Sequence, residues 1–149
     1  MIKMKHLIFT LFCVLMTMST AGCRLVFEPE VDAVSRMFAS MPTGDNRVVR
    51  ELCDGEEVCS RLNRVAGLVR SDWYANKKDF YQIKEVQIDE ESGLSYVYVD
   101  IRLPASGRDR ERMLPLTFEM ERIKLRWHIY NVDGIDEFIR RATRARGIL

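Results

Sequence analysis

The sequence has no excess of charge of either sign. It holds 23 lysines and arginines against 22 aspartates and glutamates in 149 residues, a formal net charge of +1. A nucleic-acid-binding protein needs a basic face that neutralises phosphates, so we expect no nucleic acid among the partners. Low-complexity tracts and internal repeats are also missing, and the length suits a single domain.

Motifs of enzyme active sites are missing as well. The sequence has no Gly-rich phosphate loop, no Ser/His/Asp order and no cluster of metal-binding residues. Catalytic residue types come together only at Tyr98, Asp100 and His128, and the strand pattern described below directs these side chains away from the core. A catalytic base needs an orienting partner and a pocket. The sequence therefore predicts no enzyme, no catalytic residue and no metal.

The longest apolar run is too short to span a membrane as a helix. Leu7–Met18 offers about a dozen residues, whereas a spanning helix needs roughly 20. Lys3 and Lys5 precede this run, and small residues lead from it to Cys23. A positive start, a short apolar stretch and small residues before the cut are the layout of a cleaved export signal.

The small residues in front of Cys23 resemble the lipobox of bacterial lipoproteins, although Thr20 stands where an aliphatic residue is usual. The resemblance implies that residues 1–22 are removed and that Cys23 carries a diacylglycerol and an N-acyl lipid. No other cofactor is expected. The alternatives are a plain signal peptide cut nearby and an uncleaved anchor.

The lipobox divides the chain into a signal peptide, a short tether over 23–28 and a single domain over 29–149. Arg24 follows the cysteine, where an Asp favours retention in the inner membrane of enterobacteria. The resemblance therefore implies a chain anchored in the outer membrane of the bacterial cell envelope, facing the periplasm. The tether is short, so we expect the domain to sit close to the bilayer.

The cysteine count fits export. Of the four cysteines, Cys13 belongs to the predicted signal and Cys23 to the lipobox, which leaves Cys53 and Cys59. An even remainder in an exported chain predicts a disulfide, and the Asp54-Gly55 turn between the two favours it. Two free buried thiols are the alternative. A metal or redox role is weaker, because no second pair and no C-x-x-C spacing is present.

Apolar residues at helical spacing predict helices in the first half of the domain. The first begins at Glu28-Pro29-Glu30, where Pro and acids suit a helix start, and it ends at Pro42-Thr43-Gly44. Two more helices are expected over about 45–52 and 56–70. Trp73 and Tyr74 follow, and we expect them to cap the core or to edge a pocket.

From about Phe80 the apolar period changes to alternation, which predicts strands. The step from Ile83 to Val86 breaks the alternation and indicates a bulge. Short connections imply an antiparallel meander with one buried face. The pattern gives an α+β class, with helices on one face of a curved four-stranded sheet. The expected elements are strands over 81–88, 96–103, 114–121 and 125–130, a turn at 90–93, a charged loop at 104–112, a turn at 122–124 and a last helix over 135–146.

The order of these elements, with the closing run Arg126-Trp127-His128-Ile129-Tyr130-Asn131-Val132, resembles lipoproteins of the nuclear-transport-factor-2-like (cystatin-like cone) superfamily over about residues 30–132. The resemblance implies helices packed into a curved sheet. The C-terminal helix and the disulfide-clamped helices depart from its simplest members. Function stays open, because the fold hosts enzymes, ligand binders and assembly modules. A ligand binder would have an apolar pocket, with the lining Phe38, Val65, Phe118 and Trp127.

Two surfaces are candidates for protein contact. Alternation places Tyr96, Tyr98, His128 and Tyr130 on the sheet face away from the core, and tyrosine is enriched at interfaces. Such a face often makes a homodimer in cone-fold proteins, whereas scattered tyrosines are also ordinary in strands.

The second surface is the basic side of the last helix, with Arg140, Arg141 and Arg144. These side chains suit anionic head groups or an acidic partner; the alternative is a solvated rim on a docked helix. The sequence therefore predicts a membrane-anchored lipoprotein without enzymatic activity, which acts as an assembly or docking component of an envelope system with an envelope protein as its partner. A small-molecule-binding module is the alternative, and an isomerase-like enzyme that uses the face of Tyr98, Asp100 and His128 is a weaker one.

Overall fold

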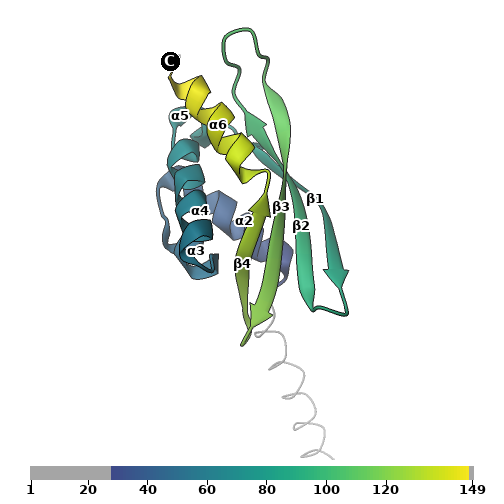
Figure 1. Ribbon diagram of the computed structural model, residues 1–149. Coiled ribbons are helices and arrows are strands. Elements are labelled where there is room, and N and C mark those ends of the chain that lie inside the picture. Colours follow the sequence, from purple (N-terminus) through teal and green to yellow (C-terminus); the bar gives the residue numbers. More distant parts are fainter. Residues whose placement is uncertain (1–27, 148–149) are drawn as a thin grey trace, which may run out of the picture.

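The computed structural model describes residues 28–147 (Figure 1). In this part of the chain, the helices lie on one face of a four-stranded sheet and leave the other face open (Figure 1). This arrangement confirms the predicted α+β class. In chain order the elements are α2 (Glu30–Ser40), the 3-10 helix η2 (Met41–Thr43), α3 (Arg47–Leu52), α4 (Glu56–Val69), α5 (Asp72–Ala75), β1 (Tyr81–Asp89), β2 (Leu94–Leu103), β3 (Arg112–Ile123), β4 (Arg126–Asp133) and α6 (Ile135–Arg146).

The sheet is the predicted antiparallel meander, with the strand order β1-β2-β3-β4. Residues of β2 alternate between buried and half-buried along the whole strand, because helices cover only one face of the sheet. The expected bulge lies between Ile83 and Glu85. A second shift of register follows Glu119 and leaves Tyr130 without a directly opposed residue in β3.

Phe38 of α2 is fully buried in the core. Its ring stacks on Tyr81 at 4.8 Å between centroids and meets Phe118 edge-on at 5.7 Å. Val65 and Trp127 are buried as well. In the ligand-binding alternative, Phe38, Val65, Phe118 and Trp127 would line a pocket. In the structure their side chains fill the core instead, and the two cavities described below have other linings.

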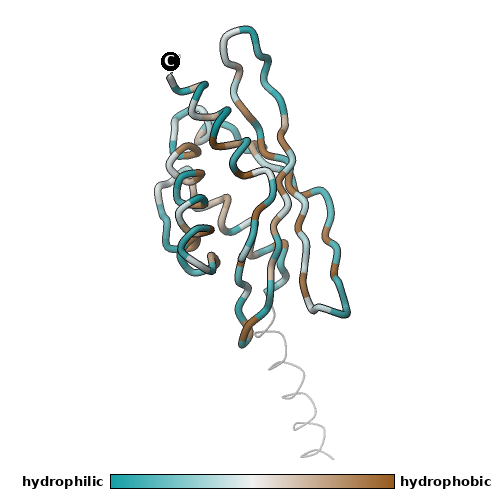
Figure 2. Tube along the Cα trace, viewed as in Figure 1, coloured by the Kyte–Doolittle hydropathy of each residue, from teal (hydrophilic) through white to brown (hydrophobic). Residues whose placement is uncertain are grey.

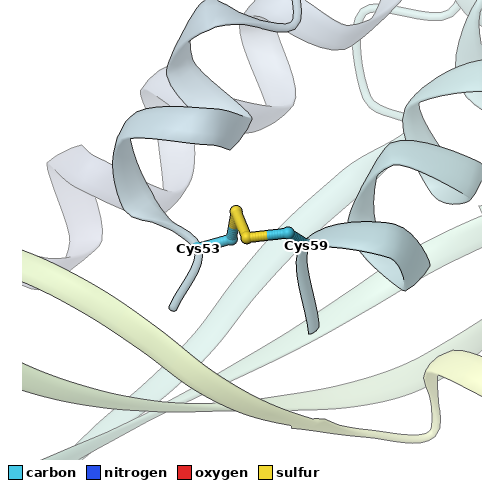
Figure 3. Close-up of a disulfide and its surroundings, with 2 residues drawn as sticks. All are labelled: Cys53 and Cys59. Atoms are coloured by element: carbon cyan, nitrogen blue, oxygen red, sulfur yellow. A yellow bond between two sulfur atoms is a disulfide. The ribbon is translucent and has the colours of Figure 1, made fainter. Parts of the chain in front are cut away.

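The disulfide predicted from the cysteine count is present (Figure 3). Cys53 follows the last residue of α3, Cys59 lies in the first turns of α4, and their Cα atoms are 5.1 Å apart. Cys53 also forms a parallel β-bridge with Ile129, and the amide of Asp54 donates to the carbonyl of Ile129 at 2.8 Å. The disulfide therefore clamps two helices at the place where they touch the sheet.

The turn between β3 and β4 consists of Lys124 and Leu125, which both have positive φ (49° and 77°). A two-residue hairpin turn of type I′ needs left-handed conformation at both central positions, and Asn-Gly is the preferred pair. The alternation in the sequence predicts that Leu125 begins the fourth strand, over 125–130, with Trp127 and Ile129 on the same face. This expectation is wrong, because the turn takes up Leu125 and leaves it 61% exposed.

Loss of the disulfide should lower stability. We expect Cys53→Ser with Cys59→Ser to reduce the free energy of unfolding by about 2 kcal/mol, because the reduced chain regains the entropy of a small open loop. Urea unfolding of the oxidised wild type, the reduced wild type and the double variant measures the effect. The reduced wild type should match the variant; equal stability of all three would contradict the prediction.

Relief of the strained turn should raise stability. We expect Lys124→Asn with Leu125→Gly to increase the free energy of unfolding by about 1–2 kcal/mol, because each left-handed residue with a large side chain carries a steric cost. Urea midpoints at unchanged slope would show the gain. Lys84→Asn with Ile88→Gly is the control for substitution elsewhere in the sheet and should not stabilise.

Candidate functional site: two pockets beside the C-terminal helix

Helix α6 begins after a tight approach of backbone to backbone. Gly134 has φ +84°, and a Cβ on it would lie 2.6 Å from the carbonyl oxygen of Pro115. Glycine is therefore needed at the point where the chain turns from β4 into the helix. The acids Asp136 and Glu137 occupy its first turn, and Arg144 and Arg146 its last, as the helix dipole favours. The helix buries a continuous apolar side, made by Ile135, Phe138, Ile139, Ala142 and Ala145.

The exposed side of α6 faces the β2–β3 loop across a pocket of about 260 Å³. Arginines from both elements surround this cavity, which we call the arginine pocket. Its lining contains one acid, Asp109. The complete lining is Leu103, Pro104, Ser106, Asp109, Arg110, Arg112, Arg140, Arg141 and Arg144.

The arginines of this pocket differ in their partners. Arg140 and Arg141 both donate to the carboxylate of Glu137, one helical turn before them. Within residues 28–147, no acid pairs with Arg110, Arg112 or Arg144, and all three are exposed. A guanidinium presents a planar fork that fits carboxylate and phosphate oxygens in pairs. The pocket therefore has unused donors for an anion.

The carboxylate of Glu111 lies close in sequence to the arginine pocket but binds other cations. Glu111 stands between Arg110 and Arg112 in sequence, but it accepts hydrogen bonds from Lys77 at 2.9 Å and from Arg102 at 2.9 Å. The bond from Lys77 first, and then the bond from Arg102, lowers the pKa of Glu111. The acid stays ionised and occupied elsewhere, so it does not neutralise the pocket.

An apolar cleft of about 270 Å³ lies on the other side of α6. Trp73 of α5 lines it, and Lys77 Nζ stands 4.8 Å above that ring. Tyr74 is buried beside it, and its hydroxyl donates to the carbonyl of Arg102 at 2.8 Å. Both expected roles of this pair are thus found, because Tyr74 caps the core and Trp73 edges a cleft. Pro104 lines both cavities, so they are neighbours.

The tyrosines of the sheet lie on the open face, as expected. Tyr98 donates to Gln87 Oε1 at 3.2 Å. Tyr96 lies opposite Glu119. Burial, the charge of Glu119 and the neighbouring Tyr96 raise the pKa of Tyr130 to about 12. On this face Tyr96 and Tyr130 therefore lie beside the carboxylate of Glu119.

The structure does not bring Tyr98, Asp100 and His128 together. His128 is opposite Glu121, whereas Tyr98 is opposite Thr117, four residues along β3. At ~3.3 Å per residue this offset alone separates the pair by roughly 13 Å, and β3 lies between their strands. Asp100 is farther along still, opposite Pro115. Common chemistry of these three side chains therefore has no geometric basis on this face.

The arginine pocket lies at the opposite end of the sheet from Glu28, the first described residue. Leu103 and Arg112 are opposed at the pocket end, whereas the Trp127 indole donates to the carbonyl of Glu28 at the other end, at 2.8 Å. In Figure 1 the β2–β3 loop and the β3–β4 turn lie at opposite ends of the sheet. Strand β2 runs between the two ends with ten residues, which span roughly 30 Å.

Only part of this site was predicted from the sequence. Arg140, Arg141 and Arg144 of the helix were candidates for contact, and residues 104–112 were expected to form a charged loop. Arg110 and Arg112 could not be joined to the helix from the sequence, because 31 and more residues separate them from Arg144 and only the fold makes them neighbours. The signal that was present is the dense charge of Arg108–Arg112.

Comparison of the chain with protein-family models, with curated proteins and with solved structures gives no match. The lipobox at Cys23 lies outside the described residues. Across residues 28–147, no helix has the length and apolar character needed to cross a membrane, and no group of three metal-binding side chains is found.

A small polyanion should stabilise the protein by filling the arginine pocket. With tripolyphosphate as the probe, we expect the free energy of unfolding to rise by about 2.7 kcal/mol at a concentration about 100 times the dissociation constant. Thermal unfolding with and without the probe measures this. Arg112→Gln with Arg144→Gln should lose the effect.

The matched control for charge is Arg64→Gln with Lys84→Gln, which removes two exposed cations outside the pocket and should keep the stabilisation. Equal stabilisation of the pocket variant would show that the probe binds elsewhere.

Proposed function

We propose that the protein is a lipid-anchored component of the bacterial cell envelope that docks a partner protein at its far end. The observation that supports this proposal is the arginine pocket, in which Arg110, Arg112 and Arg144 have no acid partner among residues 28–147. The role is one of assembly or docking, without catalysis.

The anchor is the lipidated Cys23, which holds the domain on the outer membrane with the domain in the periplasm. The Cys53–Cys59 disulfide supports export, because such bonds persist in oxidising compartments. The five peptide steps between Cys23 and Glu28 span at most about 18 Å. The Glu28 end of the sheet thus stays near the bilayer, and the arginine pocket points into the periplasm.

The partner is an acidic segment of another envelope protein. Lipid head groups of the anchoring membrane are too far away, because the pocket stands roughly 30 Å from the anchored end and the Debye length is about 8 Å at physiological ionic strength. A segment that carries carboxylates and one bulky apolar side chain would fill both cavities beside α6, with the carboxylates at Arg112 and Arg144 and the apolar group at Trp73.

A second candidate function follows from the same two cavities. A small amphiphile with an anionic head and an apolar tail would place its head among the arginines and its tail beside Trp73, since Pro104 adjoins both. The protein would then be a small-molecule-binding module, and a small molecule instead of a protein would be recovered with it. We also propose that the domain belongs to the cystatin-like cone superfamily, which includes both ligand binders and assembly modules.

Docking is tested by cross-linking in cells. A photoreactive residue in place of Ser106, inside the arginine pocket, should capture a protein through an acidic segment. Charge reversal by Arg112→Glu with Arg144→Glu should abolish the product, because like charges then face each other. Tyr98→Ala with Tyr130→Ala is the control on the open sheet face and should leave the product unchanged.

The outcomes separate the alternatives. A cross-link to a second copy of the chain would indicate a homodimer, and recovery of a small molecule without protein would favour the binding module. Loss of the product in the tyrosine variant alone would move the docking surface to the sheet. In the same cells, labelled palmitate should mark the wild type and not Cys23→Ser; an unlabelled wild type would contradict the anchor.

A further inference from the structure

Among the described residues, large apolar side chains are exposed at only one end of the sheet. They are Ile88 with 63% exposure, Ile123 with 39% and Leu125 with 61%. All three belong to the turns or strand ends beside Glu28, and the β3–β4 turn is the brown tip at this end of the tube in Figure 2. Ile123 and Leu125 share the β3–β4 hairpin, and exposed apolar groups gathered at one place indicate a contact surface.

The β3–β4 tip, residues 122–126, alternates cations with aliphatic residues: Arg122, Ile123, Lys124, Leu125 and Arg126. Lys124 and Arg126 are exposed, and Arg122 lies over the Trp127 ring at 5.8 Å. Aliphatic groups that enter the acyl boundary, flanked by cations that reach the head groups, are the composition of segments at a membrane interface.

The conformation of the tip supports a role beyond the turn itself. Lys124 and Leu125 stand at left-handed positions where Asn and Gly would fit without strain. Strained residues of this kind gather at functional sites, and an observed outlier is grounds for a functional hypothesis. Here the strained pair, Lys124 and Leu125, places a cation and an aliphatic side chain at the tip of the hairpin.

The position of the tip, near the predicted lipid anchor, indicates that its partner is the membrane. Trp127 follows the tip directly and holds the carbonyl of Glu28 at 2.8 Å. Cys23 is five residues upstream of Glu28, within at most about 18 Å along the chain. A lipid on Cys23 therefore brings the bilayer to the side of the domain that carries the tip.

We propose that the β3–β4 tip is a second membrane contact, which inserts Leu125 and Ile123 at the lipid interface and places Lys124 and Arg126 on anionic head groups. This inference rests on the proposed anchor at Cys23. The neighbouring β1–β2 turn carries the acids Asp89, Glu90 and Glu91 and is held off the same surface by its charge. Two attachment points fix the orientation of the domain and direct the arginine pocket away from the membrane.

The two tryptophans of the chain lie at opposite ends of the domain, so they report on depth in the membrane. The experiment uses the lipidated full-length protein reconstituted in vesicles of phosphatidylethanolamine and phosphatidylglycerol with brominated acyl chains, which quench nearby tryptophan fluorescence. The Trp73→Phe protein reports on Trp127 alone. We expect strong quenching of Trp127, and a loss of quenching in the same protein with Lys124→Asn and Leu125→Gly. The Trp127→Phe protein reports on Trp73 at the far end and should not be quenched.

The turn variant is a clean test because Asn-Gly suits the hairpin and should not unfold it; circular dichroism verifies this. Flotation of the vesicles measures anchoring independently of quenching. Equal quenching of Trp127 with and without the two turn substitutions would overturn the tip contact and leave the anchor in place. Flotation without quenching of Trp127 would do the same. A wild type that neither floats nor takes up palmitate would overturn both, because two aliphatic side chains do not hold a domain on a membrane.

Discussion

The packing of helices onto one face of the sheet is the constraint on which the rest of the structure depends. Phe38 fixes this contact by meeting Tyr81 and Phe118 from the helix layer. Because only one face is buried, the central strand β2 alternates strictly between buried and half-buried residues. The helices also leave the ends of the hairpins uncovered, so the sheet has two free ends and one free face with which other molecules can interact.

The two ends of the sheet carry different chemistry. The end beside Glu28 exposes aliphatic side chains in a two-residue turn, whereas the other end gathers arginines from the β2–β3 loop and α6. A separation of roughly 30 Å exceeds the Debye length several times over, so a charge bound at one end has little influence on the other. Under the proposed anchor, attachment and docking are therefore electrostatically independent functions of one small domain.

Local patterns explain what the sequence predicted well. The strand alternation of β2 and the helical spacing of α4 depend on neighbouring residues alone, and the class and the meander follow from them. The Cys53–Cys59 disulfide followed from counting, since the pair is close in sequence and one turn joins it. Helix α5 was not predicted, because four residues are too few to show a helical period.

Contacts between distant segments explain what was not predicted. Whether Phe38 and Phe118 fill a core or line a cavity depends on how closely the layers approach, and apolar patterns are the same in both cases. Arg112 and Arg144 meet only because α6 returns across the end of the sheet. The exact turn at Lys124 was missed for another reason: Leu125 continues the alternation of Trp127 and Ile129, and a pattern of hydrophobicity carries no information on the sign of φ.

The conformation of the β3–β4 turn also bears on function. Asn-Gly would give the most stable two-residue turn at these positions. With Gly in place of Leu125, the apolar alternation of the fourth strand would begin at Trp127, as it does in the structure. The chain instead has Lys124 and Leu125 at left-handed positions and exposes the leucine to solvent. Exposure of the leucine is unfavourable for an isolated domain and becomes favourable if the tip lies in a lipid interface, where the leucine leaves water and the lysine meets a phosphate. The steric cost of the two left-handed positions lies within the chain and stays the same in that environment. Contact with lipid would offset this cost.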